Sequence, residues 1–402
     1  MMESLSVEPD ARGHQFIPYL LFLARRLLAN GVELRLMTTQ SALEHPAYQM
    51  LQQQLSGCMA VSVMPEIRNR GGRLLGLLQR QFDYHRAVSA GFNALPENAR
   101  PDHVIVLSMD GMDRATVLRG SPFGRTSFSG LFVHLKIHWQ SLGVAPSGRF
   151  PKVQEFLLER LLRKKTVSAM ATIDGSLPKW WQARHSDTAE KLRYVPDPGQ
   201  VRLLESKQQA RAALGIAPTQ FFVLVYGEIS SKKNVAALLA ATEHCKQDLH
   251  IILAGTINAD IKHLLTSSTT VSALIEAGKL RIFGNYADLH FEQRLFAAAD
   301  LAWLGYEKAA TGQSAVLAQA ASAGVPVLAR QGGWIGWMTQ QHRLGECVDA
   351  EDPRAVAAAI TKLHCNDDLM EAYRKAGLQF AKARSEIAFT DAFLGCLPEF
   401  RA

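Results

Sequence analysis

Short apolar runs alternate with amphipathic segments along the chain, which is the pattern of an α/β protein. An apolar run over 4–9 precedes a polar turn and then a helical pattern whose apolar positions, three and four residues apart, extend from Phe16 to Leu28. Asn30-Gly31 is a typical helix end, and 32–38 has the pattern of a second strand. A strand, a helix and a strand at this spacing predict a βαβ unit and therefore a parallel sheet.

The alternation continues through both halves of the chain and predicts two successive parallel α/β domains. The Pro- and Gly-rich stretch 194–199 separates them as a linker, so we expect the first domain over 1–198 and the second from 199. A ligand cleft is expected between the domains, at the carboxyl ends of the strands. In the first half, the remaining expected elements are strands over 103–108, 131–135 and 167–173 and a helix over 153–163. In the second half, they are strands over 221–226, 249–254, 280–283, 301–304 and 325–329 and helices over 234–243, 291–299, 314–323 and 353–363.

The composition is that of a globular protein, with 402 residues of which 48% are hydrophobic and 20% charged. A net charge of +7 is compatible with a phosphorylated partner or an anionic membrane. The sequence has no long Lys/Arg block of the kind that would favour binding to nucleic acid. Five cysteines without a CxxC pair favour reduced thiols. No signal-peptide pattern and no apolar run of membrane-spanning length are seen, so we expect a cytoplasmic protein.

Two glycine-containing turns in the second half have the composition of a phosphate site. Thr311-Gly312-Gln313-Ser314 lies between an expected strand and an expected helix, where free backbone N–H groups and the helix dipole favour an anion. The other turn has Gly227 after a strand and the pair Lys232-Lys233 before a helix. Both follow strands of one parallel sheet, so they can converge on one site. The alternative is two ordinary strand–turn–helix connections with a solvated helix start.

Seven segments in a fixed order give the second half a resemblance to the retaining family-4 (group 1) glycosyltransferases of GT-B fold, over about 195–365. The segments are the Gly-x-Ile…Lys-Lys loop (227–233), LHIILAG (249–255), RIFGNY (281–286), ADLAWLGY (299–306), QAASAGVPV (319–327), QGGWIG (331–336) and LGECVDAEDP (344–353).

The resemblance implies two Rossmann-like parallel-sheet domains that face each other across a cleft. Their expected extents are 1–198 and 199–379, with a C-terminal helix at about 380–402 crossing back to the first domain. It also implies retaining transfer of a hexose, without a bound metal, from a nucleotide diphosphate sugar to a glycan or lipid-linked acceptor in polysaccharide or glycoconjugate biosynthesis. The donor would bind the second domain and the acceptor mainly the first.

The family's site residues carry over to matching positions of this chain. Lys233 would contact the donor pyrophosphate with help from Lys232, and His138, with His134 as the fallback, would face the donor sugar. The alternative for His138 is a hydrogen-bonded polar residue at a strand end. The other positions implied are Gly227, Gly312, Gln313 and Ser314 for the phosphates, Gly284, Asn285 and Tyr286 for the base, and Gly13 and His14 on the acceptor side.

The sequence departs from the family pattern at three places. Two glutamates eight positions apart, which in the family contact the donor sugar and the ribose, are Thr311 and Gln319 here. Gln319 can still bind a diol, because an amide both donates and accepts hydrogen bonds. Glu307 lies near Thr311 in the sequence and could replace the missing carboxylate, or it could be a surface charge of the loop. Where the family has an arginine after the first glycine, this chain has Glu228, whose charge opposes a phosphate.

These departures keep two other functions open. One is a catalytically silent GT-B-like subunit that binds a partner glycosyltransferase or a glycan, and the other is a related enzyme such as a nucleotide-sugar 2-epimerase. The basic amphipathic segment 150–165 could rest on the inner face of an anionic membrane and reach a lipid-linked acceptor, or it could be a core-facing helix with a basic end. No zinc signature, Walker A loop or Asp-x-Asp metal motif is seen.

Overall fold

A computed structural model describes residues 3–10, 15–67, 74–144, 151–198, 205–245, 248–284, 288–308 and 314–400. The chain divides into two compact units. The first comprises Met1–His138, Ser147–Pro198 and Glu386–Ala402, and the second comprises Trp139–Pro146 and Gly199–Ser385. The short segment that starts at Trp139 therefore groups with the second unit, although the sequence predicted all of 1–198 in the first.

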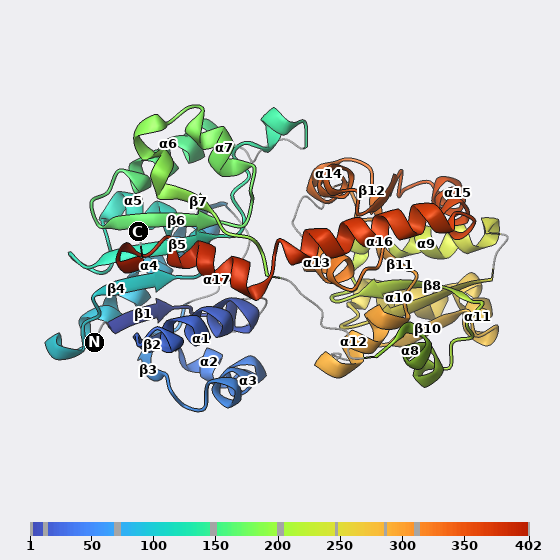
Figure 1. Cartoon of the computed structure of the whole chain (residues 1–402), viewed down its shortest axis with the longest axis horizontal. Coiled ribbons are helices and arrows are strands. Elements are labelled where there is room, and N and C mark those ends of the chain that lie inside the picture. The colour runs from blue at the N-terminus through green and yellow to red at the C-terminus, as the bar shows by residue number, and fades with distance from the viewer. Residues whose placement is uncertain are drawn as a thin grey trace. The chain divides into compact units, whose positions relative to one another are not determined.

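The first unit is built on a parallel sheet of seven strands in the order β3-β2-β1-β4-β5-β6-β7 (Figure 1). The strand order reverses between β1 and β4, because β2 and β3 lie on one side of β1 and the later strands on the other. In a parallel α/β sheet, the carboxyl ends of the strands at this reversal form the usual ligand site. The strands are β1 (Glu3–Val7), β2 (Glu33–Thr39), β3 (Ala60–Met64), β4 (His103–Val106), β5 (Ser127–Phe132), β6 (Val167–Thr172) and β7 (Leu192–Tyr194).

Helices cover both faces of this sheet, so its strands are buried on both sides. Val104 and Val106 of β4 belong to the core shared with α4, α6 and α7, while Ile105 and Leu107 belong to the core shared with α1, α3 and α17. Successive side chains of a strand point to opposite faces, which explains why β4 is apolar throughout. The helices are α1 (Leu21–Ala29), α2 (Gln40–Leu43), α3 (Pro46–Leu55), α4 (Leu74–Asn93), α5 (Asp113–Arg119), α6 (Pro151–Leu162), α7 (Leu177–Gln182) and α17 (Glu386–Leu394).

The second unit has a parallel sheet of six strands in the order β10-β9-β8-β11-β12-β13, and its strand order reverses between β8 and β11. The strands are β8 (Phe221–Tyr226), β9 (Leu249–Ala254), β10 (Leu280–Phe283), β11 (Leu301–Leu304), β12 (Val327–Arg330) and β13 (Gly345–Val348). The helices are α8 (Lys207–Leu214), α9 (Val235–Ala241), α10 (Ala259–Ser267), α11 (Thr269–Glu276), α12 (Leu289–Ala298), α13 (Ala315–Ser322), α14 (Gly333–His342), α15 (Pro353–His364) and α16 (Asp367–Lys382).

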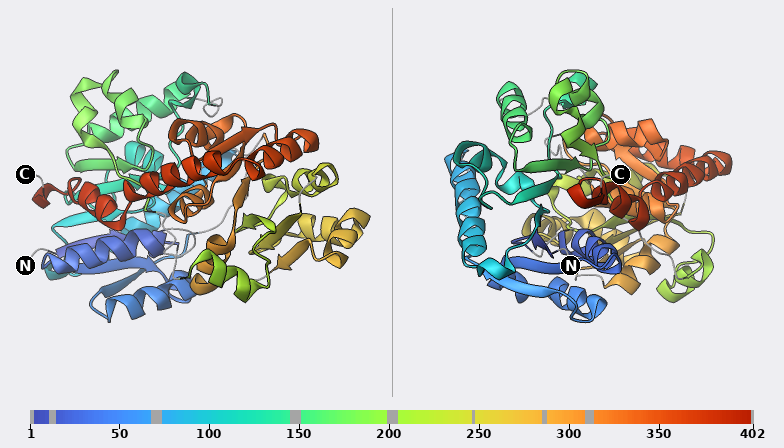
Figure 2. Two further views of the ribbon diagram at one scale, coloured as in Figure 1. Left: turned by 45° about the vertical axis from the view of Figure 1, so that its right-hand side comes forward. Right: turned by 60° about the vertical axis from the view of Figure 1, so that its left-hand side comes forward.

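Two separate cores line the two faces of the second sheet. One is shared with α8, α12, α13 and α14, and the other with α9, α11 and α15. Helix α13 is rich in alanine, and its Ala320 and Ala321 are buried in the core that lines one face of the sheet. Small side chains let the helix lie close to the strands, so its first turn is held near the strand ends where the order reverses. Figure 2 shows the two units from two further directions.

The C-terminal helix returns to the first unit. Helix α17 lies beside α1 (Figure 1). Its Phe389 and Phe393 are fully buried in the core there, and Tyr19 stacks on Phe389 with ring centroids 5.4 Å apart. The Ser129 hydroxyl of β5 donates to the carbonyl of Cys396 at 2.9 Å. The end of the chain is therefore an integral part of the first unit.

Helix α6 packs on the sheet through its apolar face. Leu158, Leu161 and Leu162 are buried in the core, as the core-facing alternative expects, whereas Val153 and Phe156 are each more than half exposed. Within the described residues, no helix is both long and apolar enough to cross a membrane.

Candidate functional site

Two glycine turns meet at the carboxyl ends of the neighbouring strands β8 and β9, beside the reversal of strand order in the second unit. Gly227 follows β8 with φ of +92° and donates its N–H to the Ala254 carbonyl at 2.9 Å, and Gly255 follows β9 with φ of +129°. A Cβ atom on Gly255 would overlap the Gly227 carbonyl. Both positions need glycine, because the backbone angles are left-handed and the two turns touch main chain to main chain.

Lys233 is the buried cation of this site. Its side chain is 6% exposed, and its ammonium group donates to the Tyr226 carbonyl at the end of β8. The ammonium lies 5.9 Å from the centre of the Tyr306 ring, which follows β11. Burial lowers the pKa of Lys233 from 10.5 to about 8, and the nearby Glu228 carboxylate partly opposes this shift. A desolvated ammonium with one carbonyl partner is well suited to bind an anion.

The neighbours of Lys233 in the same loop are less enclosed. Lys232 is exposed, and its carbonyl accepts from the Glu307 N–H at 2.8 Å, so this contact joins the loops after β8 and β11. Glu228 is exposed and accepts from the Asn258 side-chain amide at 3.0 Å. The carboxylate at 228 is thus held by an uncharged group.

The start of α13 lies next to the Gly227 turn. A Cβ atom on Gly227 would be 3.5 Å from the Lys233 ammonium and 3.8 Å from the Val316 side chain. Ser314 precedes the helix, and its hydroxyl is 3.0 Å from the Tyr306 hydroxyl. The fold therefore brings together the two turns that the sequence singled out. The residues predicted beside Ser314, namely Thr311, Gly312 and Gln313, lie outside the described residues.

Gln319, on the second turn of α13, contacts a carboxylate. Its side-chain amide donates to Glu292 Oε1 at 3.0 Å, and the Tyr226 hydroxyl donates to Glu292 Oε2. Glu292 is on the first turn of α12 and is half-buried, as is Gln319. Among the residues predicted for the base, Gly284 is exposed after β10, and Asn285 and Tyr286 lie outside the described residues.

His138 lies in the first unit and is fully buried. Its Nε2 atom is 2.7 Å from the Ser176 hydroxyl and 3.2 Å from an Asp174 carboxylate oxygen. Ser176 in turn donates to Asp174 through its hydroxyl at 2.6 Å and its backbone N–H at 3.0 Å. The imidazole is thus part of a hydrogen-bonded group at the carboxyl end of β6, and its contact with a donor sugar stays a prediction.

Glu8 occupies the reversal of strand order in the first unit. It follows β1, is fully buried, and accepts from the Ser108 hydroxyl after β4 and from the Asp10 N–H at 3.0 Å. Burial raises the pKa of the Glu8 carboxyl to about 8, against the lowering effect of these hydrogen bonds. Gly13 and His14, predicted for this side, lie outside the described residues.

Two further acids lie beyond Ser108. Asp110 accepts from the backbone N–H groups of Val133 at 2.7 Å and His134 at 3.1 Å, which fixes the loop after β5. Asp113 accepts from the Gln81 amide at 2.7 Å, and burial raises the pKa of Asp113 to about 6. The carboxyl edge of the first sheet therefore carries one buried acid, Glu8, and two half-buried acids, Asp110 and Asp113. Carboxyl groups such as these can bind the hydroxyl groups of a sugar.

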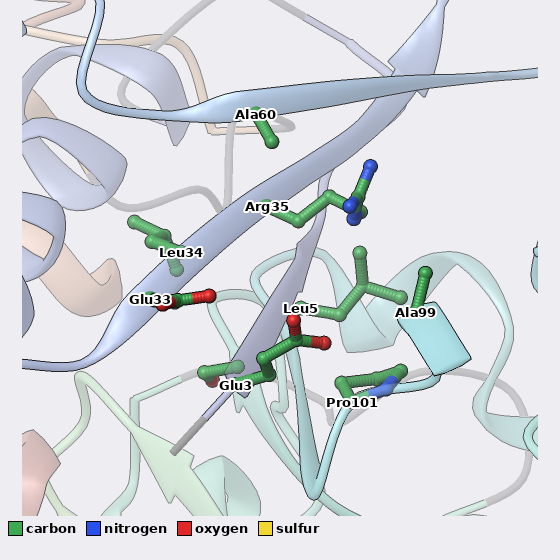
Figure 3. Close-up of a pocket in the computed structure, with 9 residues that line it drawn as sticks. Glu3, Leu5, Glu33, Leu34, Arg35, Ala60, Ala99 and Pro101 are labelled. Atoms are coloured by element: carbon green, nitrogen blue, oxygen red, sulfur yellow. The ribbon is translucent and has the colours of Figure 1, made fainter. Parts of the chain in front are cut away.

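A pocket in the first unit lies at the other edge of the sheet. It is lined by residues at the amino ends of β1, β2 and β3, among them Glu3, Glu33 and Ala60 (Figure 3). Its volume of about 50 Å³ is small compared with the roughly 300 Å³ or more of ordinary ligand sites. The amino-end pocket is therefore too small for a sugar nucleotide.

The Gly255 contact gives a stability prediction. Changing Gly255 to alanine is expected to cost about 3 kcal/mol of unfolding free energy, since the new Cβ forces the turn at Gly227 to move. Gly278→Ala is the matched control, because Gly278 also has a positive φ, +67°, but nothing lies near its Cβ position; it should cost about 1 kcal/mol. Urea unfolding of both variants measures the difference, and equal losses would contradict this account of the turn.

The amino-acid sequence of residues 206–380 matches the family model described as group 1 glycosyl transferases. This segment is therefore similar to the group 1 glycosyl transferases. The matched segment includes β8 to β13 and contains Lys233, Glu292 and Gln319. A search of curated proteins found no match to the chain.

Solved structures with the same fold are similar over the whole chain. A glycosyltransferase from Rickettsia africae is 14% identical with a TM-score of 0.65, covering 99% of this chain and 98% of its own. Anabaena HepE in complex with UDP has the same identity and TM-score, with 98% of each chain covered. Sucrose-phosphate synthase from Thermosynechococcus elongatus is also 14% identical with a TM-score of 0.65, covering 97% and 96%. The predicted GT-B fold, with two Rossmann-like parallel-sheet domains, is confirmed.

The residues at the two sites that were not predicted from the sequence include Glu8, Asp110, Asp113, Tyr226 and Glu292. A signal existed for Glu8, since it is a charged residue directly after the first buried strand, at the edge where α/β proteins bind ligands. Glu292 has no such signal, because it lies within a helix, 27 residues from its partner Gln319.

Proposed function

We propose that the protein is a retaining glycosyltransferase that moves a hexose from a nucleotide diphosphate sugar to a glycan or lipid-linked acceptor. The observation that carries this proposal is the buried Lys233 ammonium beside Gly227 and the start of α13, at the carboxyl ends of β8 and β11. A buried cation, a glycine turn and a helix start together favour a diphosphate.

In the proposed reaction, the bond between the sugar and the diphosphate breaks while the acceptor hydroxyl approaches from the same face. A donor phosphate oxygen takes the hydroxyl proton, so no protein nucleophile is needed. Lys233 and the helix start of α13 stabilise the negative charge that collects on the leaving diphosphate. Since these groups supply positive charge, we propose that transfer needs no bound metal.

The acceptor is assigned to the first unit, where Glu8, Asp110 and Asp113 gather at the carboxyl edge of the sheet. Carboxyl groups are common partners of sugar hydroxyls because each carboxyl group can accept two or more hydrogen bonds. His138, with Asp174 and Ser176, is proposed to support the donor sugar from this unit.

A specific observation favours a second candidate, the silent subunit that binds a partner or a glycan. Gln319 is already hydrogen-bonded to Glu292, and Glu228 adds a negative charge close to Lys233. Both features weaken a donor site of the usual family composition.

Nucleotide binding separates the two candidates. UDP, GDP, ADP and dTDP, free and as sugar conjugates, are added to the full chain with a metal chelator, and the melting temperature is measured. One nucleotide is expected to stabilise the protein by about 2.7 kcal/mol at 100 times its dissociation constant, which raises the melting temperature by a few degrees. Folded protein that responds to none of these ligands would contradict the transferase and support the silent subunit.

A further inference from the structure

Gln319 stands where the resemblance expects a glutamate that contacts the ribose, yet a carboxylate is present at the same place in space. Glu292 of α12 lies 3.0 Å from the Gln319 amide nitrogen, through its Oε1 atom. The resemblance expects this carboxylate on α13, whereas in this chain it is on α12. It still lies within one hydrogen bond of position 319.

The position of Glu292 is fixed from two sides. The Tyr226 hydroxyl donates to Oε2, and the Tyr226 ring packs edge to face on Phe296, one turn further along α12, with centroids 5.2 Å apart. Asp288 caps α12 by accepting from the Phe291 N–H at 2.8 Å, which fixes the first turn that holds Glu292. The carboxylate is thus held in a defined orientation at low entropic cost.

Tyr226 also connects this carboxylate to the proposed diphosphate site. The Tyr226 carbonyl accepts from the Lys233 ammonium, while its hydroxyl, at the far end of the side chain, reaches Glu292. The cation and the anion are therefore about one tyrosine length apart. A nucleoside diphosphate has its charged phosphates and its neutral ribose hydroxyls at a similar separation.

We infer that Glu292 binds the ribose diol of the donor nucleotide and makes the site selective for ribonucleotides over 2′-deoxyribonucleotides. Gln319 acts as its positioning residue and adds an amide to the same diol. A carboxylate accepts from two adjacent hydroxyls at once, and it remains half-buried and accessible here. The inference rests on the proposed donor site of the second unit.

The same geometry predicts that restoring the family residue at 319 is harmful. Gln319→Glu places a second carboxylate within hydrogen-bond distance of Glu292, so the two negative charges repel each other. The exchange variant Glu292→Gln/Gln319→Glu returns the single carboxylate to α13 and keeps one amide beside it. The exchange variant should therefore recover what Gln319→Glu alone loses.

The test measures dissociation constants of UDP, GDP and ADP and their 2′-deoxy counterparts by calorimetry on the full chain. Wild type is expected to prefer the ribose form of the nucleotide that binds. Glu292→Gln should weaken that form about tenfold to a hundredfold and leave the deoxy form nearly unchanged. The exchange variant should regain most of the preference. Glu205→Gln is the matched control, because Glu205 pairs with Arg294 of the same helix at 2.7 Å; it should retain wild-type preference.

Wild type and Glu292→Gln could show the same preference for the ribose form over the deoxy form, while melting curves show that both proteins are folded. This result overturns the inference and leaves the proposed donor site standing. Equal binding of ribose and deoxyribose forms by wild type does the same. Wild type that binds no nucleotide overturns the proposed function, and the inference with it. An exchange variant that binds no better than Gln319→Glu also counts against the assignment.

Discussion

Replacing Lys233 with methionine is expected to weaken binding of the donor nucleotide by roughly a hundredfold and to slow glycosyl transfer further. A hydrogen bond from a charged group contributes about 1.5–3 kcal/mol, and an ammonium can make more than one such bond to a diphosphate. Transfer suffers more than binding because negative charge on the diphosphate grows as the sugar bond breaks. Calorimetry with the nucleotide and a transfer assay measure the two losses.

The fold should tolerate the Lys233→Met change. The ammonium is buried with one carbonyl contact, so a neutral side chain of similar length removes a desolvated charge rather than a stabilising pair. Lys232→Met is the matched control, because Lys232 is the exposed neighbour in the same loop, and we expect a loss of threefold or less. If Lys233→Met bound the nucleotide as well as wild type, the diphosphate would not lie at the Gly227 turn.

The pH dependence offers an independent readout of the same residue. Burial lowers the pKa of Lys233 to about 8, so the free protein loses this positive charge as the pH rises through 8. A bound diphosphate favours the charged form and raises the pKa again. Nucleotide affinity should therefore fall between pH 8 and pH 10 in wild type and in Lys232→Met. Lys233→Met should lack this fall, and a decline that persists in it would assign the titration to another group.

Much of the fold could be predicted because buried parallel strands are apolar on both faces. The runs over 221–226 and 249–254 coincide with β8 and β9. The predicted strand at 131–135 was wrong by four residues, since β5 spans Ser127–Phe132. Its centre contains Ser129 and Gly130, and a Cβ atom on Gly130 would lie 3.0 Å from the Met170 sulfur and 3.2 Å from Met109. Close packing requires small residues at these positions. Because serine and glycine interrupt the apolar run, the hydrophobic pattern did not indicate the first half of the strand.

Separation along the sequence decides which residues of the site could be predicted. Gly227 and Lys233 are six residues apart, so one loop places them together and the sequence pattern was sufficient to find them. Glu292 and Gln319 are 27 residues apart, and Glu8 and Ser108 are 100 apart. These pairs meet only because β1 lies beside β4 and because α12 and α13 pack on the same face of their sheet. Sheet order is a property of the whole domain, which no local pattern contains.

Replacing Glu8 with glutamine is expected to raise the free energy of unfolding above pH 8 by an amount on the order of 4 kcal/mol. The folded protein keeps the Glu8 proton up to a pKa of about 8, whereas the unfolded chain releases it near 4.5. Between these values the folded state binds more protons than the unfolded state, so wild-type stability declines as the pH rises from about 4.5 to about 8. Glutamine removes this decline, because an amide does not titrate.

The amide also fits the contacts of the carboxyl group. Its oxygen can accept from the Asp10 N–H, and its nitrogen can donate to the Ser108 hydroxyl, which turns to accept. Urea unfolding of wild type and Glu8→Gln at intervals from pH 5 to pH 9 measures the difference, with exposed Glu33→Gln as the control. The two curves should meet near pH 5 and separate steadily above it, while a smaller dependence from Asp113, with its pKa of about 6, remains in both. Parallel curves would mean that Glu8 is ionised in the folded protein, and the acceptor edge of the first sheet would then carry a further negative charge, beside that of Asp113, at neutral pH.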